Sequence, residues 1–244
     1  MQSNPKKIKK NFQKSIDKYS ENAVVQNIMA EKLVAAVKPK VFDNILELGA
    51  GAGVLTKKVS ENFKYDRYYA NDLVEKSSIY VEKYVPQALF FAGDFRRINF
   101  KRCFNLIISN AVFQWFKNLD KIIEKCSGML ECDGVLAFST FSPDNLREFR
   151  EVSGLSLEYK SVDYIKNILE KDFEIISIES FDYQLKFDNP LKILAHMKNT
   201  GVNSLTDKSW SVKDVKIFCD NYNRMFPELT LTYSPIIIVC KKKQ

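Results

Sequence analysis

The chain has 244 residues, of which 45% are hydrophobic and 27% are charged, and its formal net charge is +7 at pH 7. This composition supplies a packed core and excludes a disordered or fibrous protein. No apolar run is long enough to cross a membrane, and the basic first residues do not begin a signal peptide. The positive charge is typical of an ordinary basic protein or of one with an acidic partner, either a protein, a nucleic acid or a membrane.

The cysteines and the single histidine offer little for a metal site or a disulfide framework. There are five cysteines, an odd number, and no two have Cys-x-x-Cys spacing. His196 is the only histidine. We therefore expect reduced thiols, no bound metal and a cytoplasmic protein.

Hydrophobic periodicity predicts helices and strands that alternate along most of the chain. In chain order we expect helices at 5–20 and 22–37, a strand at 44–49, a helix at 53–63, a strand at 67–72, a helix at 75–84, strands at 88–92 and 104–109, a helix at 118–130, a strand at 134–141, a helix at 161–171, a strand at 174–187, helices at 190–199 and 211–225, and a strand at 230–240. This order predicts an α/β fold, with a mostly parallel seven-stranded sheet and helices on both faces. The alternating pattern of 174–187 is typical of a sheet edge, and we expect an antiparallel edge strand.

The most informative segment is the turn after the first predicted strand. The apolar run 44–48 contains Glu47 and is followed by glycines at 49, 51 and 53. Without side chains, the backbone of this turn can approach a ligand closely, and the following helix begins with free N–H groups. Such a turn holds a dinucleotide or S-adenosylmethionine. A dinucleotide fingerprint places its third glycine three residues after the second, whereas here the separation is two.

The segment Glu47-Leu-Gly-Ala-Gly-Ala-Gly53 resembles motif I of class I S-adenosylmethionine-dependent methyltransferases. The resemblance implies a Rossmann-like fold and S-adenosylmethionine as the cofactor. Two acids at later strand ends agree with it: Asp72, where the ribose hydroxyls bind, and Asp94, near the adenine. Either acid alone is more typical of a solvated turn or a helix N-cap, and only the three acids together favour the cofactor site. The expected cofactor-binding residues are Glu47, Gly49, Gly51, Gly53, Asp72, Leu73, Asp94, Phe95, Ser109 and Asn110.

Four further segments resemble one family within this class, the malonyl-[acyl-carrier protein] O-methyltransferases of biotin synthesis. The segment 109–115 is similar to the family's Ser-Asn…Gln-Trp signature. Similar family segments are Phe12 to Tyr19 with Ala23 to Gln26, Met197 to Asn203, and Leu231-Thr-Tyr233. The likeness runs from about residue 8 to 240. The family's Gly-Pro-Gly is Gly51-Ala-Gly53 here, and the segment 139–142 matches only loosely, which leaves the substrate pocket open.

The resemblance implies methyl transfer to the free carboxylate of a malonyl group carried on acyl-carrier protein or coenzyme A. We expect Tyr19 to close over the reactants, Gln114 and Trp115 to line the chamber, and Lys198 to pair with the carboxylate, with Asn203 and Tyr233 as hydrogen-bond donors. Each of these side chains is also compatible with a structural role, and His196 favours one. Carrier proteins are acidic, so Lys117, Lys121 and Lys125, at four-residue spacing, are expected on one helix face as a docking ridge. The spacing alone slightly favours an ordinary solvated face.

The length of the chain and the absence of a low-complexity linker predict one domain over residues 1–244. We expect lid helices at 1–38, a cofactor-binding core at 39–187, a cap insert at 188–229 and a final strand at 230–244. Two alternatives stay open: a methyltransferase of another small carboxylate or a quinone precursor, and an RNA-directed methyltransferase suited to the positive charge. The sequence lacks the interleaved basic and aromatic repeats that an RNA-binding protein would show. A nucleic-acid partner is therefore the weaker of the two alternatives.

Overall fold

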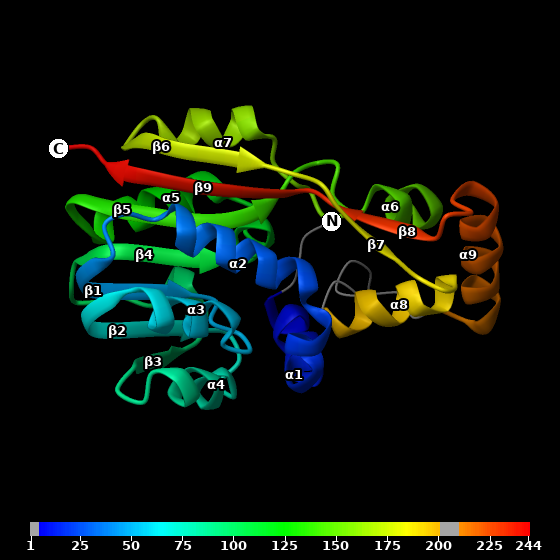
Figure 1. Cartoon of the computed structure of the whole chain (residues 1–244), viewed down its shortest axis with the longest axis horizontal. Coiled ribbons are helices and arrows are strands. Elements are labelled where there is room, and N and C mark those ends of the chain that lie inside the picture. The colour runs from blue at the N-terminus through cyan, green and yellow to red at the C-terminus, as the bar shows by residue number, and fades with distance from the viewer. Residues whose placement is uncertain (1–4, 201–209) are drawn as a thin grey trace.

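A computed structural model describes residues 5–200 and 210–244 of the chain (Figure 1). The predicted helices are all present, with ends within two residues of those expected. A short helix that periodicity did not reveal, α6, follows the fifth strand. The elements are α1 (Pro5–Asn22), α2 (Val24–Ala36), β1 (Val41–Leu48), α3 (Val54–Asn62), β2 (Lys64–Asp72), α4 (Ser77–Tyr84), β3 (Leu89–Ala92), β4 (Phe104–Asn110), α5 (Leu119–Met129), β5 (Leu130–Phe141), α6 (Arg147–Ser153), α7 (Val162–Leu169), β6 (Phe173–Ser180), β7 (Tyr183–Lys186), α8 (Pro190–Asn199), α9 (Val212–Met225), β8 (Thr230–Tyr233) and β9 (Pro235–Lys242).

The main sheet has seven strands in the order β3-β2-β1-β4-β5-β9-β6. The five neighbouring strands β3, β2, β1, β4 and β5 pair in parallel, and β9 pairs antiparallel with both β5 and β6. The expectation of a mostly parallel seven-stranded α/β sheet is confirmed. The edge strand is β6, from the predicted edge run 174–187, and it pairs antiparallel with its neighbour, so this expectation is also confirmed. The strand that runs against the others is β9, which lies one position inside the edge. The order reverses between β1 and β4, and the carboxyl end of the sheet at this point is where such folds bind ligands.

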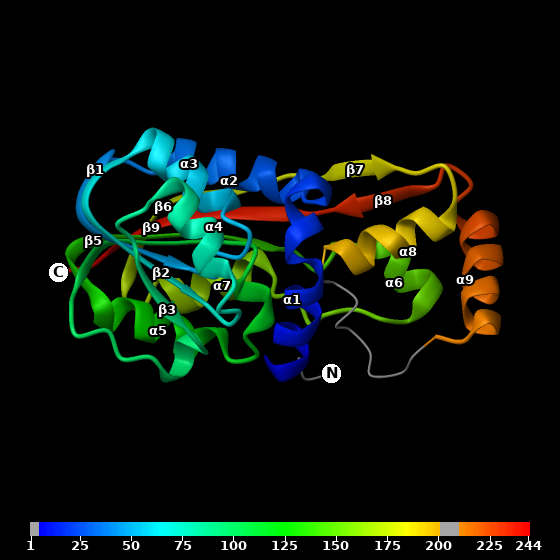
Figure 2. The same ribbon diagram turned by 90° about the horizontal axis from the view of Figure 1, so that it is seen from below.

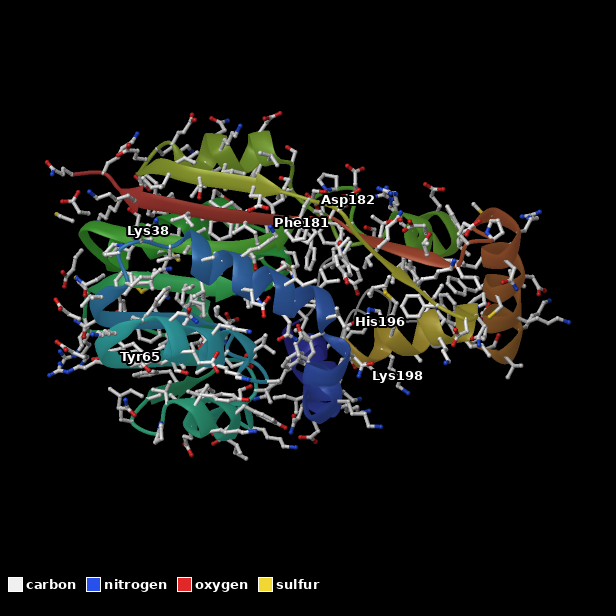
Figure 3. All side chains as sticks on the ribbon, viewed as in Figure 1. Lys38, Tyr65, Phe181, Asp182, His196 and Lys198 are labelled. Atoms are coloured by element: carbon white, nitrogen blue, oxygen red, sulfur yellow. The ribbon has the colours of Figure 1, made fainter. Side chains whose placement is uncertain are left out.

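The two last predicted strands are each divided in two. The run 174–187 is β6 and β7, and the run 230–240 is β8 and β9. The first part of the earlier run, β6, and the second part of the later run, β9, belong to the main sheet, whereas β7 and β8 pair antiparallel as a separate two-stranded ribbon. The break in the first run lies at Phe181 and Asp182 (Figure 3). There Ser234 Oγ, between β8 and β9, donates to Asp182 Oδ1 at 2.6 Å. The ribbon therefore continues beyond the sheet toward α8 and α9 (Figure 1).

Alternating residues of the central strands divide the core into two layers. Ile45 of β1 and Leu106 of β4 pack with residues of α2 and α3, whereas the neighbouring Leu46 and Ile107 pack with residues of α5 and α7. Successive side chains of a strand point to opposite faces, so nearly continuous apolar strands give a sheet that is covered on both sides. Helices on both faces are thus confirmed.

Helix α1 lies between the main sheet and the group formed by α6, α8, α9, β7 and β8 (Figures 1 and 2). Within residues 5–200 and 210–244, no helix is both long and apolar enough to cross a membrane. The division of the chain into lid, core, cap and final strand stays a prediction.

Candidate functional site

The glycine turn lies at the carboxyl end of β1 and has the backbone that its sequence predicts. The backbone φ angles of Gly49, Gly51 and Gly53 are 72°, 53° and 73°. Residues other than glycine rarely adopt this left-handed conformation. A Cβ atom on Gly49 would lie 2.3 Å from Val112 Cγ2, and one on Gly53 would lie 2.9 Å from the Tyr80 carbonyl oxygen. Val112 and Tyr80 therefore pack tightly against the turn. The backbone of Gly49 and Gly51 lines a cavity.

Glu47 is fully buried beneath this turn and does not line the cavity. Its Oε2 atom accepts hydrogen bonds from Thr56 Oγ1 at 2.7 Å and from the Tyr68 hydroxyl at 2.6 Å. Its Oε1 atom has no hydrogen-bond partner among the described residues. Burial raises the pKa of Glu47 to about 7, against the lowering effect of the two hydroxyl donors. Glu47 therefore links β1 to α3 and β2 through hydrogen bonds, and it does not reach the cavity where a ligand would bind.

Asp72 ends β2 and lines the cavity next to the glycine turn. Its two carboxylate oxygens accept from the N–H groups of Gly51, at 2.9 Å, and Val74, at 2.7 Å. Burial raises the pKa of Asp72, and these backbone donors oppose the increase. The carboxylate is held in a fixed position at the wall of the cavity, which is what recognition of a pair of hydroxyls requires.

Asp94 and Phe95 lie beyond the end of β3 and also line the cavity, together with Leu73. Asp94 caps the short turn that begins at Phe95 and pairs with Arg96, whose Nη2 lies 2.5 Å from Oδ2. Hydrogen bonding to Arg96 lowers the pKa of Asp94. The N-cap interpretation of this acid therefore holds, and its position beside the cavity leaves a role in ligand binding as a proposal.

The end of β4 forms the next part of the wall. Ser109 is fully buried and donates to the Leu48 carbonyl at 2.8 Å, so it fixes β4 against β1 and does not line the cavity. Asn110 lines the cavity, accepts from Ser139 Oγ at 2.6 Å and donates to the Gln26 carbonyl at 3.0 Å. Gln114 donates to the Ala111 carbonyl at 2.7 Å, while its Oε1 atom is buried without a hydrogen-bond partner among the described residues. Trp115 follows it in the lining.

Helix α1 covers the glycine turn from the opposite side. Phe12 lies over Gly51, where a Cβ atom would lie 3.1 Å from its ring, and packs edge-on against Tyr19 with 5.0 Å between ring centroids. Both side chains line the cavity. The helix is fastened to the region of α4 by Asp17, which pairs with Lys76 Nζ at 2.7 Å and accepts from the Tyr80 hydroxyl.

Tyr233 brings β8 to the same cavity, at the end away from Asp94. Its hydroxyl lies 2.8 Å from His196 Nε2 on α8, and burial lowers the pKa of His196 to about 4, so this histidine is neutral at pH 7. Lys198 is exposed and does not line the cavity; Figure 3 shows His196 and Lys198 on different sides of α8. Asn203 lies outside the described residues.

The three lysines expected to form one ridge do not share a helix face. Lys117 is exposed but precedes α5, which begins at Leu119. Lys125 turns inward, donating to the carbonyls of Phe95 and Ile98 at 2.7 Å each. Desolvation lowers the pKa of Lys125. Lys125 is therefore no part of a docking ridge, because it fastens α5 to the turn after β3, and docking on Lys117 and Lys121 stays a prediction.

One cavity thus joins most of the predicted residues. It brings together Tyr19, Gly49, Gly51, Asp72, Leu73, Asp94, Phe95, Asn110, Gln114, Trp115 and Tyr233, while Glu47, Gly53, Ser109 and Lys198 lie outside its lining. Sequence reasoning missed Asn145 and Tyr159, which also line it. The position of Asn145 just after a predicted parallel strand was an available signal. Tyr159 lies between helices in an irregular segment and carried none.

Comparison with known proteins agrees with this geometry. A family model described as "Methyltransferase domain" matches residues 46–138. The chain is 34% identical over 241 residues to malonyl-[acyl-carrier protein] O-methyltransferase of Calditerrivibrio nitroreducens, covering 97% of this chain and 96% of that protein. It is 33% identical over 244 residues to the protein of the same name from Haemophilus influenzae, covering 96% and 94%. Among solved structures, N-methyltransferase NodS of Bradyrhizobium japonicum, in complex with S-adenosyl-L-homocysteine, has a TM-score of 0.58 at 12% identity and covers 97% of this chain and 99% of that one, which shows a shared fold.

The sheet, the glycine turn and the acids at successive strand ends define an S-adenosylmethionine-dependent methyltransferase of class I. The described residues fit the cofactor, since the turn presents bare backbone to the cavity and a fixed buried carboxylate stands beside it. Within that class, identity above 30% over nearly the full length places the chain in the malonyl-[acyl-carrier protein] O-methyltransferase family.

Proposed function

We propose that this protein transfers a methyl group to the free carboxylate of a malonyl group carried on acyl-carrier protein, giving the methyl ester that begins pimeloyl synthesis for biotin. The observation that carries the proposal is the single cavity that runs from Gly49, Asp72 and Asp94 to Gln114 and Tyr233. Cofactor-binding and acceptor-binding groups therefore border one space. Relatives that match nearly the whole chain bear this activity as their name.

The first end of the cavity suits the cofactor. Gly49 and Gly51 leave room for its amino-acid part, Asp72 accepts from the ribose hydroxyls, and Asp94 with Phe95 borders the adenine. S-adenosylmethionine, when bound, supplies an electrophilic methyl group on a cationic sulfonium. Trp115 offers an electron-rich wall to that cation. Glu47, Gly53 and Ser109 support this end from beneath, because they shape the turn and the strands without reaching the cavity.

In this reaction the protein has two tasks, which are to orient the two reactants and to exclude water. The malonyl carboxylate oxygen forms a bond to the methyl carbon as the carbon–sulfur bond breaks, and the electron pair of that bond stays on sulfur. A carboxylic acid with an ordinary pKa near 4 is already ionised at pH 7, so no side chain has to take a proton. Tyr19 closes the cavity from α1, and Gln114 orients the acceptor; orientation of this kind is worth several kcal/mol.

The partner is an acyl-carrier protein, and we propose that it docks on basic surface near the chamber. Lys117 and Lys121 are exposed and follow the Gln114–Trp115 segment directly in the chain. An acidic carrier would be steered toward such a surface. Lys125 is no part of this surface, since its ammonium group is occupied with two carbonyl oxygens.

The test is a direct assay of the acceptor. Purified protein is incubated with labelled S-adenosylmethionine and, in parallel, with malonyl-carrier protein, malonyl-coenzyme A and free malonate. We expect a base-labile methyl ester on the malonyl group of the carrier protein by mass spectrometry, and none on free malonate. Cofactor binding without methyl transfer to any malonyl thioester would refute the proposed acceptor and leave the class of enzyme unchanged.

A further inference from the structure

Three tyrosines line the cavity, and Tyr19 stands between its two ends, because it packs beside Ala52 and Val74 of the cofactor end. Tyr19 comes from α1, Tyr159 from the segment between α6 and α7, and Tyr233 from β8, and all three line the cavity. Burial raises the pKa of each of these phenols, and Tyr19 and Tyr159 add to the increase at Tyr233. All three groups are therefore neutral at pH 7, but the Tyr233 hydroxyl is already paired with His196 Nε2 at 2.8 Å.

Asn145 determines which way the Tyr159 hydroxyl donates. The Ser234 N–H donates to Asn145 Oδ1 at 3.1 Å, which places the amide nitrogen on the opposite side. Asn145 Nδ2 donates to the Tyr159 hydroxyl oxygen at 2.9 Å. Because this oxygen already accepts from Asn145, the phenolic hydrogen is left to donate elsewhere, and both side chains line the cavity.

The backbone holds Asn145 in this position. The N–H group of Asn145 donates to the Ser142 carbonyl, and Leu146 N–H donates to the Thr232 carbonyl at 2.7 Å. Ser142 N–H donates in turn to the Ser234 carbonyl at 2.9 Å. The turn after β5 is thus fastened to the chain that links β8 and β9, and Asn145 is 1% exposed. A side chain held this firmly is suited to orient a neighbour.

The charged groups of the lining come from α1 and from the ends of β2 and β3, and none comes from the segments that carry Asn145, Tyr159 and Tyr233. Arg150, which lies close enough to Tyr159 to lower its pKa, is outside the lining. Among the described residues, those that carry charge in the lining are Lys9, Asp72, Asp94 and Arg96. Arg96 is paired with Asp94, and Lys9 lies close enough to Asp72 to lower its pKa. Lys198, the cation that the sequence offered for the malonyl carboxylate, is exposed and outside the lining.

We propose that Tyr159, positioned by Asn145, donates a hydrogen bond to the malonyl carboxylate, so that the acceptor is recognised by neutral hydroxyls in place of a cation. This inference rests on the proposed function. Its chemical reason is that the acceptor loses its negative charge in the reaction. A strong cation would stabilise the carboxylate more than the transition state and slow the transfer, whereas neutral donors orient it with a smaller penalty.

The test compares two carrier proteins on the enzyme saturated with S-adenosylhomocysteine, so that no turnover occurs. Malonyl-carrier protein has the carboxylate, whereas acetyl-carrier protein has the same arm without it. Tyr159→Phe is expected to reduce the preference for the malonyl form by about tenfold or more, the usual effect of a hydrogen bond to a charged group. The affinity for S-adenosylhomocysteine is expected to stay unchanged. Tyr164→Phe, on the exposed side of α7, is the matched control and should keep the full preference.

Asn145→Ala provides a second, independent variant. It should reduce the same preference, and it should add little in the Tyr159→Phe background, because both changes remove one interaction. A general structural defect would instead weaken both carrier proteins and S-adenosylhomocysteine together. If the wild-type protein methylates malonyl-carrier protein while Tyr159→Phe and Asn145→Ala keep the full preference, the inference is overturned and the proposed function stands. If the wild-type protein makes no malonyl methyl ester, the proposed function itself has failed.

Discussion

The carboxyl group of Glu47 lies in the core, out of contact with water. It is fully buried, it accepts two hydroxyl donors on one oxygen, and burial raises its pKa from 4.5 to about 7. The folded protein therefore holds this proton at pH values where the unfolded chain has released it. The resulting contribution to stability is present in full below about pH 4.5 and is lost as the pH rises to about 7.

Glu47→Gln is expected to remove this part of the pH dependence, because the amide does not titrate. Between about pH 4.5 and 7, the free energy of unfolding of the wild type should fall relative to the variant by about 3 kcal/mol at most. Urea unfolding at several pH values measures the difference. Glu82→Gln, at an exposed position of α4, is the control and should run parallel to the wild type. Parallel curves for Glu47→Gln as well would contradict the prediction.

At the scale of elements, α1 connects the two parts of the site. Phe12 and Tyr19 border the cavity, whereas Asp17 on the exposed side pairs with Lys76 and Tyr80. A helix of this length is only marginally stable on its own in water. The position of α1 therefore depends on its contacts with other elements. The Asp17 contacts therefore act on the closure of the cavity more than on the core.

Asp17→Asn is expected to loosen α1 without unfolding the protein. Hydrogen exchange should become faster in residues 12–19, and S-adenosylhomocysteine should bind roughly two- to fivefold more weakly. The melting temperature should change little, because exposed ion pairs add little to global stability. Asp188→Asn, which removes the exposed pair with Lys192 next to α8, is the control and should leave α1 unaffected. Unchanged exchange in α1 would show that Asp17 does not hold the helix.

At the scale of the whole molecule, the net charge of +7 suits an acidic carrier protein. Such attraction acts over several ångströms and is screened by salt, with a Debye length of about 10 Å at 0.1 M. A small substrate that lacks the carrier's acidic surface should not share this dependence. The comparison of the two acceptors therefore separates docking from chemistry.

We expect the KM for malonyl-carrier protein to rise by roughly tenfold between low and physiological salt, while the KM for malonyl-pantetheine changes little. Lys117→Glu with Lys121→Glu should raise the carrier KM at low salt and flatten its salt dependence. Lys213→Glu with Lys216→Glu, exposed on α9, makes the same change of charge and should have a smaller effect. Equal effects of the two pairs, in steady-state kinetics, would assign the attraction to total charge and not to the proposed docking surface.

Local patterns were sufficient for most of the fold. Apolar runs and the turn at Gly49–Gly53 predicted the parallel strands, because a buried strand and a tight turn are determined by neighbouring residues. The break at Phe181–Asp182 was not predicted, although the apolar positions change there from even (Ile176, Ile178) to odd (Phe181 onward). Such a change of phase does not by itself distinguish a β-bulge from the end of a strand. The placement of β9 inside the edge likewise depends on pairing with β5 and β6, which lie far from it in the chain.

The sequence by itself determined the class of enzyme and its cofactor, because motif I is a contiguous segment whose backbone shape follows from its own glycines. Only the tertiary structure decided which polar groups share the cavity. It placed Lys198 outside and brought in Asn145 and Tyr159, which no spacing connects. The physical reason is that the orientation of a hydrogen-bond donor depends on partners such as the Ser234 N–H, 89 residues from Asn145 in the chain.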